Sequence, residues 1–349
     1  MFSFLRKPRT APAVANAAQA SEPAAARQQL TAPSASQWLQ RLEWTVLKRL
    51  DGQLQGDYRS LFRGAGLVLA DLREYQTHDD VRHIDWNVTA RMQTPYVREH
   101  QEDREVSAWL VVDLSGSVNF GSGQTSKRQL ACEVATVLAR MLSRHGNRVG
   151  ALLFNGEARA RCVLPARSGR RHLLQWVHQL LNLAPASGAQ ATTLGAWLAQ
   201  TLAVVRRRSV VFVVSDFISA PGWDKDLARL TRRHEVVAVR LRDPLEMALP
   251  NVGMLLMQDA ETGEQLLVDG NDVVFRQRFG QLALQREAQL RSQLAQAGVD
   301  CLELSTDEAL DMALLRFAQL RKRASQLSTG GTPTQTRPHA PSPSGSLHA

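Results

Sequence analysis

The feature that most constrains the fold of this chain is an alternation of short apolar runs and longer amphipathic stretches that begins near residue 106. Short apolar runs are typical of buried strands, and stretches with an apolar stripe at helical spacing are typical of helices packed on a sheet. The expected strands cover residues 106–112, 149–154, 161–164, 210–214, 235–241 and 299–304, and the expected helices cover 126–145, 169–183, 194–206, 224–233, 272–297 and 307–323. This order predicts an α/β fold with a doubly wound, mostly parallel, Rossmann-like sheet.

A β-hairpin insertion is expected between the strand at 235–241 and the helix at 272–297. Residues 255–268 fit two strands around the turn sequence Glu261-Thr262-Gly263-Glu264. We therefore predict an antiparallel excursion from an otherwise parallel sheet.

The rest of the chain divides by composition. Residues 1–36 are rich in Ala, Pro, Ser and Gln and are expected to form a disordered leader, and residues 324–349 are expected to form a disordered tail. Residues 37–105 are expected to form an N-terminal segment packed on the sheet, and residues 106–323 the α/β domain.

Charge and cysteine content narrow the setting of the protein. The formal net charge is +9, but no aromatic residues interleave with the arginine clusters, so nucleic-acid binding is disfavoured while contact with a membrane surface stays open. Three widely spaced cysteines, Cys132, Cys162 and Cys301, argue against a disulfide framework. No run of about 18 apolar residues is present, and the N-terminus has no proper apolar signal region, so we expect a cytoplasmic protein.

Polar residues that follow the predicted strands indicate a metal site. The strand at 106–112 runs into Asp113-Leu114-Ser115-Gly116-Ser117, which places one carboxylate and two hydroxyls on one loop. Oxygen donors of this kind suit Mg²⁺ or Mn²⁺ and not zinc or copper. On its own this motif is a weak pattern, because short Asp/Ser turns occur by chance, and the alternative is a turn in which Ser or Asp caps the next helix.

Two other segments raise the weight of the metal interpretation. Thr192 precedes the helix expected at 194–206, and Asp216 follows the most apolar strand, at 210–214. Ligands of open α/β sheets bind at the carboxyl ends of the strands, so these groups are expected to meet Asp113, Ser115 and Ser117. The predicted metal ligands are Asp113, Ser115, Ser117, Thr192 and Asp216.

This constellation resembles the von Willebrand factor A domain, whose metal-ion-dependent adhesion site uses an Asp-x-Ser-x-Ser motif, then a threonine, then an aspartate. The resemblance implies that these residues hold Mg²⁺ with an open position for a carboxylate of a protein partner.

The segment upstream of the sheet narrows the resemblance further. Its motifs are similar to those of a bacterial family of unknown function whose members are von Willebrand factor A-type proteins often encoded beside MoxR-type AAA+ ATPases. The resemblance covers roughly residues 40–322 and implies a MoxR-type ATPase and a client protein as partners. The charged residues within 73–91 are expected to form an ion network that holds this segment against the sheet. The motifs are Gly64-Ala65-Gly66, Leu72-Arg73-Glu74-Tyr75-Gln76, Asp79-Asp80-Val81-Arg82-His83-Ile84-Asp85-Trp86, Thr89-Ala90-Arg91 and Val97-Arg98-Glu99.

Enzymatic alternatives have weaker support in the sequence. The run from Gly121 to Lys127 fails as a nucleotide-binding loop because Gln124 stands at the lysine position, and Lys127 is expected on the first turn of the next helix. No GxSxG or HExxH motif occurs. The function expected is therefore a metal-dependent adaptor and not an enzyme, with a metal-dependent phosphoester hydrolase as the main alternative and RNA binding by the basic surface as a weaker one.

Overall fold

The computed structural model confirms the α/β architecture. It describes residues 2–4, 34–50, 71–76, 93–99, 107–123, 125–144, 146–184, 193–259 and 265–329, with a few positions between 81 and 90. The main sheet has six strands in the order β11-β8-β7-β4-β5-β6, and all of its pairs are parallel except β5 with β6. Its strands are β4 (Ser107–Asp113), β5 (Arg148–Phe154), β6 (Cys162–Arg167), β7 (Val210–Ser215), β8 (Glu235–Arg242) and β11 (Asp300–Ser305).

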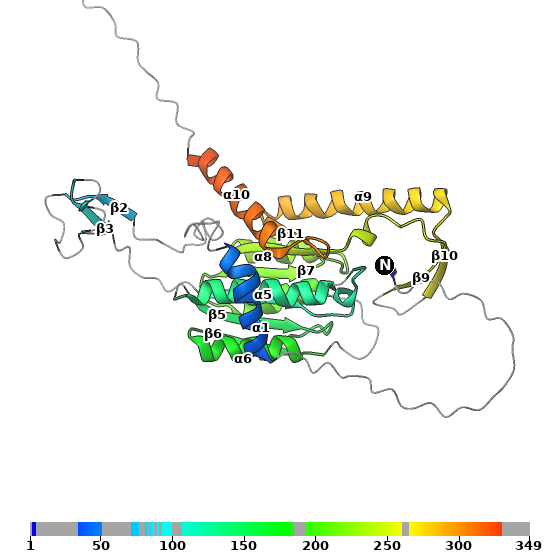
Figure 1. Ribbon diagram of the computed structural model, residues 1–349, viewed down its shortest axis with the longest axis horizontal. Helices are drawn as coiled ribbons and strands as arrows, with labels where there is room; N and C mark the ends of the chain where they lie inside the picture. Colours follow the sequence, from blue (N-terminus) through cyan, green and yellow to red (C-terminus); the bar gives the residue numbers. More distant parts are fainter. Residues whose placement is uncertain are drawn as a thin grey trace, which may run out of the picture.

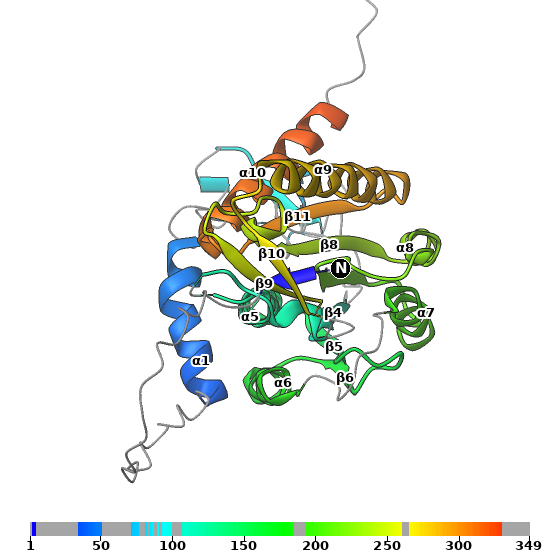
Figure 2. The ribbon, with the colours of Figure 1, turned by 90° about the vertical axis from the view of Figure 1, so that its right-hand side faces the viewer.

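Helices cover both faces of this sheet and produce two separate cores. Figure 2 shows the sheet end-on, with α1, α5 and α6 on one side and α7 and α8 on the other. Buried residues of α1, α5, α6 and α10 form the first core, and those of α7, α8 and the C-terminal half of α9 form the second. The helices are α1 (Ala35–Leu42), α5 (Lys127–Arg144), α6 (Arg170–Asn182), α7 (Leu194–Val204), α8 (Trp223–Thr231), α9 (Val273–Gln296) and α10 (Leu310–Thr329).

Local sequence explains where the best-defined helices begin and end. The Ser126 hydroxyl accepts the Gln129 N–H and so caps α5, and Gly146 follows this helix with a φ of 80°. The Asp272 carboxylate accepts the N–H groups of Val274 and Phe275 at the start of α9. The Ser126 cap places Lys127 on the first turn of α5, as the sequence predicts.

The predicted hairpin insertion is also present. Strands β9 (Met254–Asp259) and β10 (Gln265–Asp269) pair antiparallel, and the predicted turn residues between them lie outside the described part of the chain. The insertion begins with a short 3-10 helix, η4 (Pro244–Glu246), directly after β8. In Figures 1 and 2 the hairpin lies beyond the end of the sheet at which β4, β7 and β8 finish.

Two described segments lie within the ranges that the sequence predicts to be disordered. Residues 2–4 form a strand, β1 (Phe2–Phe4), that pairs antiparallel with β9. Helix α10 starts three residues later than expected, because Ser305 and Glu308 form a turn before it, and it runs past residue 323 to Thr329. No glycine or proline interrupts it before Gly330-Gly331.

The N-terminal segment is described only in parts. Helix α1 and the π-helix η1 (Glu43–Leu47) bury Trp38, Leu42 and Leu47 in the first core. Strands β2 (Asp71–Glu74) and β3 (Tyr96–Glu99) pair with each other, and in Figure 1 this two-stranded sheet lies apart from the main one. Most of the charged residues predicted to form an ion network lie outside the described residues.

Two findings concern membrane-spanning helices and the state of the cysteines. Among the helices that the structure describes, none is long and apolar enough to cross a membrane. Cys132, Cys162 and Cys301 are free thiols. The cytoplasmic location stays a prediction.

Candidate metal centre

The predicted site lies where the strand order reverses. Chain order runs outward from β4 to β5 on one side and from β7 to β8 on the other, so the ends of β4 and β7 border the crevice typical of ligand sites in open α/β sheets. Asp113 is the last residue of β4, and Asp216 directly follows β7. Because Val112 and Val214 are register partners, Asp113 lies level with Ser215, the residue before Asp216.

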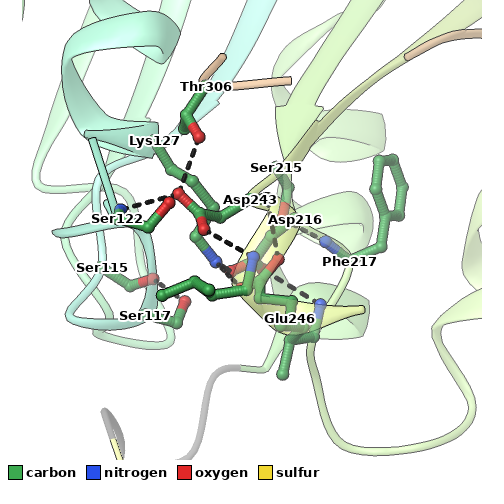
Figure 3. A network of polar contacts seen from close by, with 12 residues as sticks. Ser115, Ser117, Ser122, Lys127, Ser215, Asp216, Phe217, Asp243, Glu246 and Thr306 are labelled. Carbon is green, nitrogen blue, oxygen red and sulfur yellow. Dashed lines mark hydrogen bonds and ion pairs between the residues drawn. The ribbon is translucent and has the colours of Figure 1, made fainter. Parts of the chain in front are cut away.

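The first loop holds Asp113, Ser115 and Ser117 together. The backbone N–H of Ser115 donates to Asp113 Oδ1 at 2.9 Å, and the hydroxyls of Ser115 and Ser117 are hydrogen-bonded at 3.1 Å. All three residues are buried, and Figure 3 shows the two serine hydroxyls turned toward each other. The three side chains therefore lie together at the end of β4, and their role as metal ligands stays a prediction.

A residue that the sequence analysis did not single out links the two strand ends. The Ser215 hydroxyl donates to Asp113 Oδ2 at 2.7 Å and accepts the backbone N–H of Phe217 at 3.0 Å. Phe217 has a φ of 59°, which is uncommon for a residue with a side chain and is often found at functional sites. Ser215 thus fixes the turn after β7 and one oxygen of Asp113 at once.

Asp216 has a cationic partner within the chain. Its Oδ2 accepts a hydrogen bond from Lys127 Nζ at 2.7 Å, and its Oδ1 accepts the backbone N–H of Ile218 at 3.0 Å. Lys127 also donates to Glu246 Oε1 at 2.6 Å, and only 1% of its side chain is exposed. Burial alone would lower the pKa of Lys127, but the Asp216 and Glu246 carboxylates more than offset this and raise it, so the ammonium form is held.

Asp113, in contrast, has no ion-pair partner among the described residues. The Arg128 guanidinium interacts electrostatically with Asp113, but its N–H groups donate to the carbonyls of Leu114 and Leu183. Burial, together with the negative charge of Asp216, raises the pKa of Asp113 to about 6. A carboxylate in this state gains free energy from any cation that reaches it.

The threonine of the predicted site cannot be placed. Thr192 lies outside the described residues. Its neighbour Thr193 stands at the N-cap position of α7 without a side-chain capping hydrogen bond, and its buried hydroxyl has no hydrogen-bond partner among the described residues. The backbone N–H of Leu194 donates to Ser219 Oγ at 2.9 Å, so the start of α7 is tied to the loop after Asp216.

The donor set fits a hard divalent cation. No group of three or more His, Cys, Asp or Glu side chains suited to a metal occurs within the described ranges. The site instead combines the carboxylates of Asp113 and Asp216 with the hydroxyls of Ser115 and Ser117, and Mg²⁺ accepts few protein ligands together with water.

Lys127, Glu246 and Ser215 were missed by sequence reasoning for different reasons. Ser215 directly precedes Asp216, so its place at the strand end was a usable signal. Lys127 was noted only as part of a failed nucleotide-binding pattern. Glu246 ends the sequence Asp243-Pro244-Leu245-Glu246, a capping box in the structure, but nothing in that pattern points to Lys127.

Comparisons with known proteins identify relatives of this chain. The family model described as "Protein of unknown function DUF58" matches residues 71–289. Uncharacterized proteins of Mycobacterium bovis and Mycobacterium tuberculosis are each 36% identical over 301 residues, which are 86% of this chain and 94% of each relative.

Among solved structures, similarity is found to the conserved hypothetical protein BatB of Bacteroides thetaiotaomicron, at 17% identity over 63% of this chain and 99% of that one, with a TM-score of 0.40. An aerotolerance-related membrane protein of Bacteroides fragilis is 17% identical over 62% of this chain and 99% of that one, with a TM-score of 0.38. Likenesses of this size do not assign a fold, which rests here on the strand order. The match over residues 71–289 and the identity across most of the chain show that this protein belongs to the DUF58 family of proteins of unknown function.

Proposed function

We propose that the edge formed by the ends of β4 and β7 is a divalent-cation site of the von Willebrand factor A type. The observation that carries the proposal is the state of the buried aspartates. The described residues include four of them, Asp113, Asp216, Asp243 and Asp311. Asp216 pairs with Lys127, Asp311 pairs with Arg49, and Asp243 accepts hydrogen bonds from three residues. Asp113 accepts hydrogen bonds from Ser115 and Ser215 but has no ion-pair partner among the described residues, and burial together with the charge of Asp216 raises its pKa to about 6.

The ligands follow from the donors at this edge. Asp113, Ser115 and Ser117 would hold Mg²⁺ or Mn²⁺, with Asp216 contributing its charge and Thr192 a further hydroxyl. When bound, the ion would supply an open coordination position for a carboxylate. The protein residues align the donors, and the burial of the loop keeps competing water away from them.

A protein-binding role is favoured over phosphoester hydrolysis. Hydrolysis needs a general base within reach of the attacking water. Lys127 is held in its ammonium form by Asp216 and Glu246, so it can donate a proton but not accept one. The chain is therefore proposed as a metal-dependent adaptor whose partners, from the family resemblance, are a MoxR-type AAA+ ATPase and a client protein with an exposed Asp or Glu.

The adaptor role is tested by recovery of the ATPase. The full chain, immobilised, is expected to retain a MoxR-type ATPase encoded in the same genome in Mg²⁺ and to lose it in EDTA. The variant Asp113→Asn is expected to lose it in both buffers. Asp300→Asn serves as the matched control, because its side chain is 57% exposed at the opposite end of the sheet and pairs with Arg321. Equal recovery by wild type and Asp113→Asn would overturn the proposal.

A further inference from the structure

Lys127 joins two parts of the chain that the sheet alone does not connect. Its ammonium donates to Asp216, at the edge formed by the ends of β4 and β7 (the metal edge), and to Glu246, in the η4 helix at the start of the insertion. Figure 3 shows the lysine side chain lying between these segments. Glu246 Oε2 is itself fixed by the backbone N–H of Asp243 at 3.1 Å, so the contact reports the position of η4.

The insertion rests on the same loop that carries the serines. Asp243 Oδ2 accepts the backbone N–H of Ser122 at 2.8 Å. Phe120, two residues earlier, belongs to a small core shared with Leu249, Met257 and Val268 of the insertion. The segment from Asp113 to Ser122 therefore carries residues of the metal edge and also contacts the insertion.

We propose that Lys127 is a positioning residue that makes cation binding at the metal edge and the packing of the insertion (residues 243–259 and 265–272) depend on each other. The inference rests on the proposed cation site and adds its regulation. A buried ammonium has to keep a carboxylate partner, because an unpaired buried charge is strongly unfavourable. Lys127 has two such partners, and only one of them is also part of the metal edge.

The direction of the coupling follows from charge. A divalent cation near Asp113 and Asp216 repels the Lys127 ammonium and competes with it for Asp216. Glu246 is then the remaining partner of Lys127, and their attraction is no longer shared. Bound metal is thus expected to hold η4 and the hairpin more firmly, and by reciprocity a firmly held insertion raises the affinity for the metal.

Hydrogen exchange and calorimetry on the full chain test this linkage with MgCl₂ as the probe. In wild type, Mg²⁺ is expected to slow amide exchange in β9 and β10 about threefold or more. In Glu246→Gln, which keeps the side-chain size and an acceptor for Asp243 N–H, the slowing is expected to vanish and Mg²⁺ affinity to fall by about the same factor. A purely structural contact would change exchange equally with and without the ion.

Glu235→Gln is the matched control. Its side chain is 19% exposed, against 21% for Glu246, and it also pairs with a cation, Arg321, but at the start of β8. This variant is expected to respond to Mg²⁺ like wild type. If wild type and Glu246→Gln bind Mg²⁺ equally and the hairpin exchange does not respond to the ion, the linkage is overturned while the cation site stands. If wild type binds no Mg²⁺, both fall.

Discussion

Two buried aspartates at the same edge of the sheet, Asp113 and Asp243, show how differently a chain can treat the same side chain. Both directly end or follow a core strand, β4 and β8, and neither has an ion-pair partner among the described residues. Asp243 accepts hydrogen bonds from Ser122, Leu245 and Thr306. Asp113 accepts them from Ser115 and Ser215.

The pKa values record the difference. Burial would raise the pKa of Asp243, but the hydrogen bonds from Thr306, Ser122 and Leu245 lower it below its usual range. Burial and Asp216 raise that of Asp113 to about 6. Asp243 is stabilised as a carboxylate by its surroundings and anchors the insertion, whereas Asp113 is destabilised as a carboxylate and is suited to bind a cation.

The largest effect on stability is expected when a third buried aspartate, Asp216, loses its partner Lys127. Lys127→Met leaves the buried Asp216 and the partly buried Glu246 without a cationic partner, so it should lower the free energy of unfolding by about 3–5 kcal/mol in EDTA. Urea denaturation followed by circular dichroism measures this loss. Unchanged stability would mean that Lys127 does not neutralise Asp216. Asp113 and Asp216 would then not differ in whether the chain supplies a cation for them.

The next test substitutes the two aspartates themselves, in EDTA at pH 7. Asp243→Asn removes a charge that three hydrogen bonds stabilise, and it should lower the free energy of unfolding by about 2–3 kcal/mol. Asp113→Asn removes a buried charge that two hydrogen bonds compensate only in part, and it should raise the free energy of unfolding by about 2–3 kcal/mol. Effects of the same sign in both variants would remove the distinction between the two sites.

The sequence was sufficient for most of the fold because the relevant signals are local. The fully apolar run that became β7 and the stripe from Leu130 to Leu142 that became one side of α5 each carry their own period. The end of α10 and the pairing of Phe4 with Met257 were not predicted, since neither depends on a nearby pattern.

The site was predictable where a residue directly follows a strand, as Asp113 and Asp216 do. Strand ends of a parallel sheet meet at one edge, so topology alone brings them together. Glu246 lies 119 positions from Lys127, and their contact depends on the path of the insertion after β8. A sequence contains no local signal for such a path, so the internal cation of this edge could be found only in the structure.

A pH series sharpens the comparison with a smaller effect. The pKa of Asp113 is raised in the folded chain above its usual value, so the folded state binds the proton more tightly and the stability contribution of this group falls as pH rises toward 6. The advantage of Asp113→Asn over wild type in EDTA should therefore shrink from about 2–3 kcal/mol at pH 7 to less than about 1 kcal/mol at pH 4. An advantage that is constant over this range would contradict the raised pKa.

Calorimetric titration of Mg²⁺ into the metal-free protein tests directly whether Asp113 binds a cation. Wild type and Asp300→Asn are expected to bind the ion with equal affinity, and Asp113→Asn at least about a hundredfold more weakly, because the substitution removes a buried carboxylate that has no ion-pair partner among the described residues. Equal binding by wild type and Asp113→Asn, or no binding by any of the three, would show that this edge of the sheet is not a metal site.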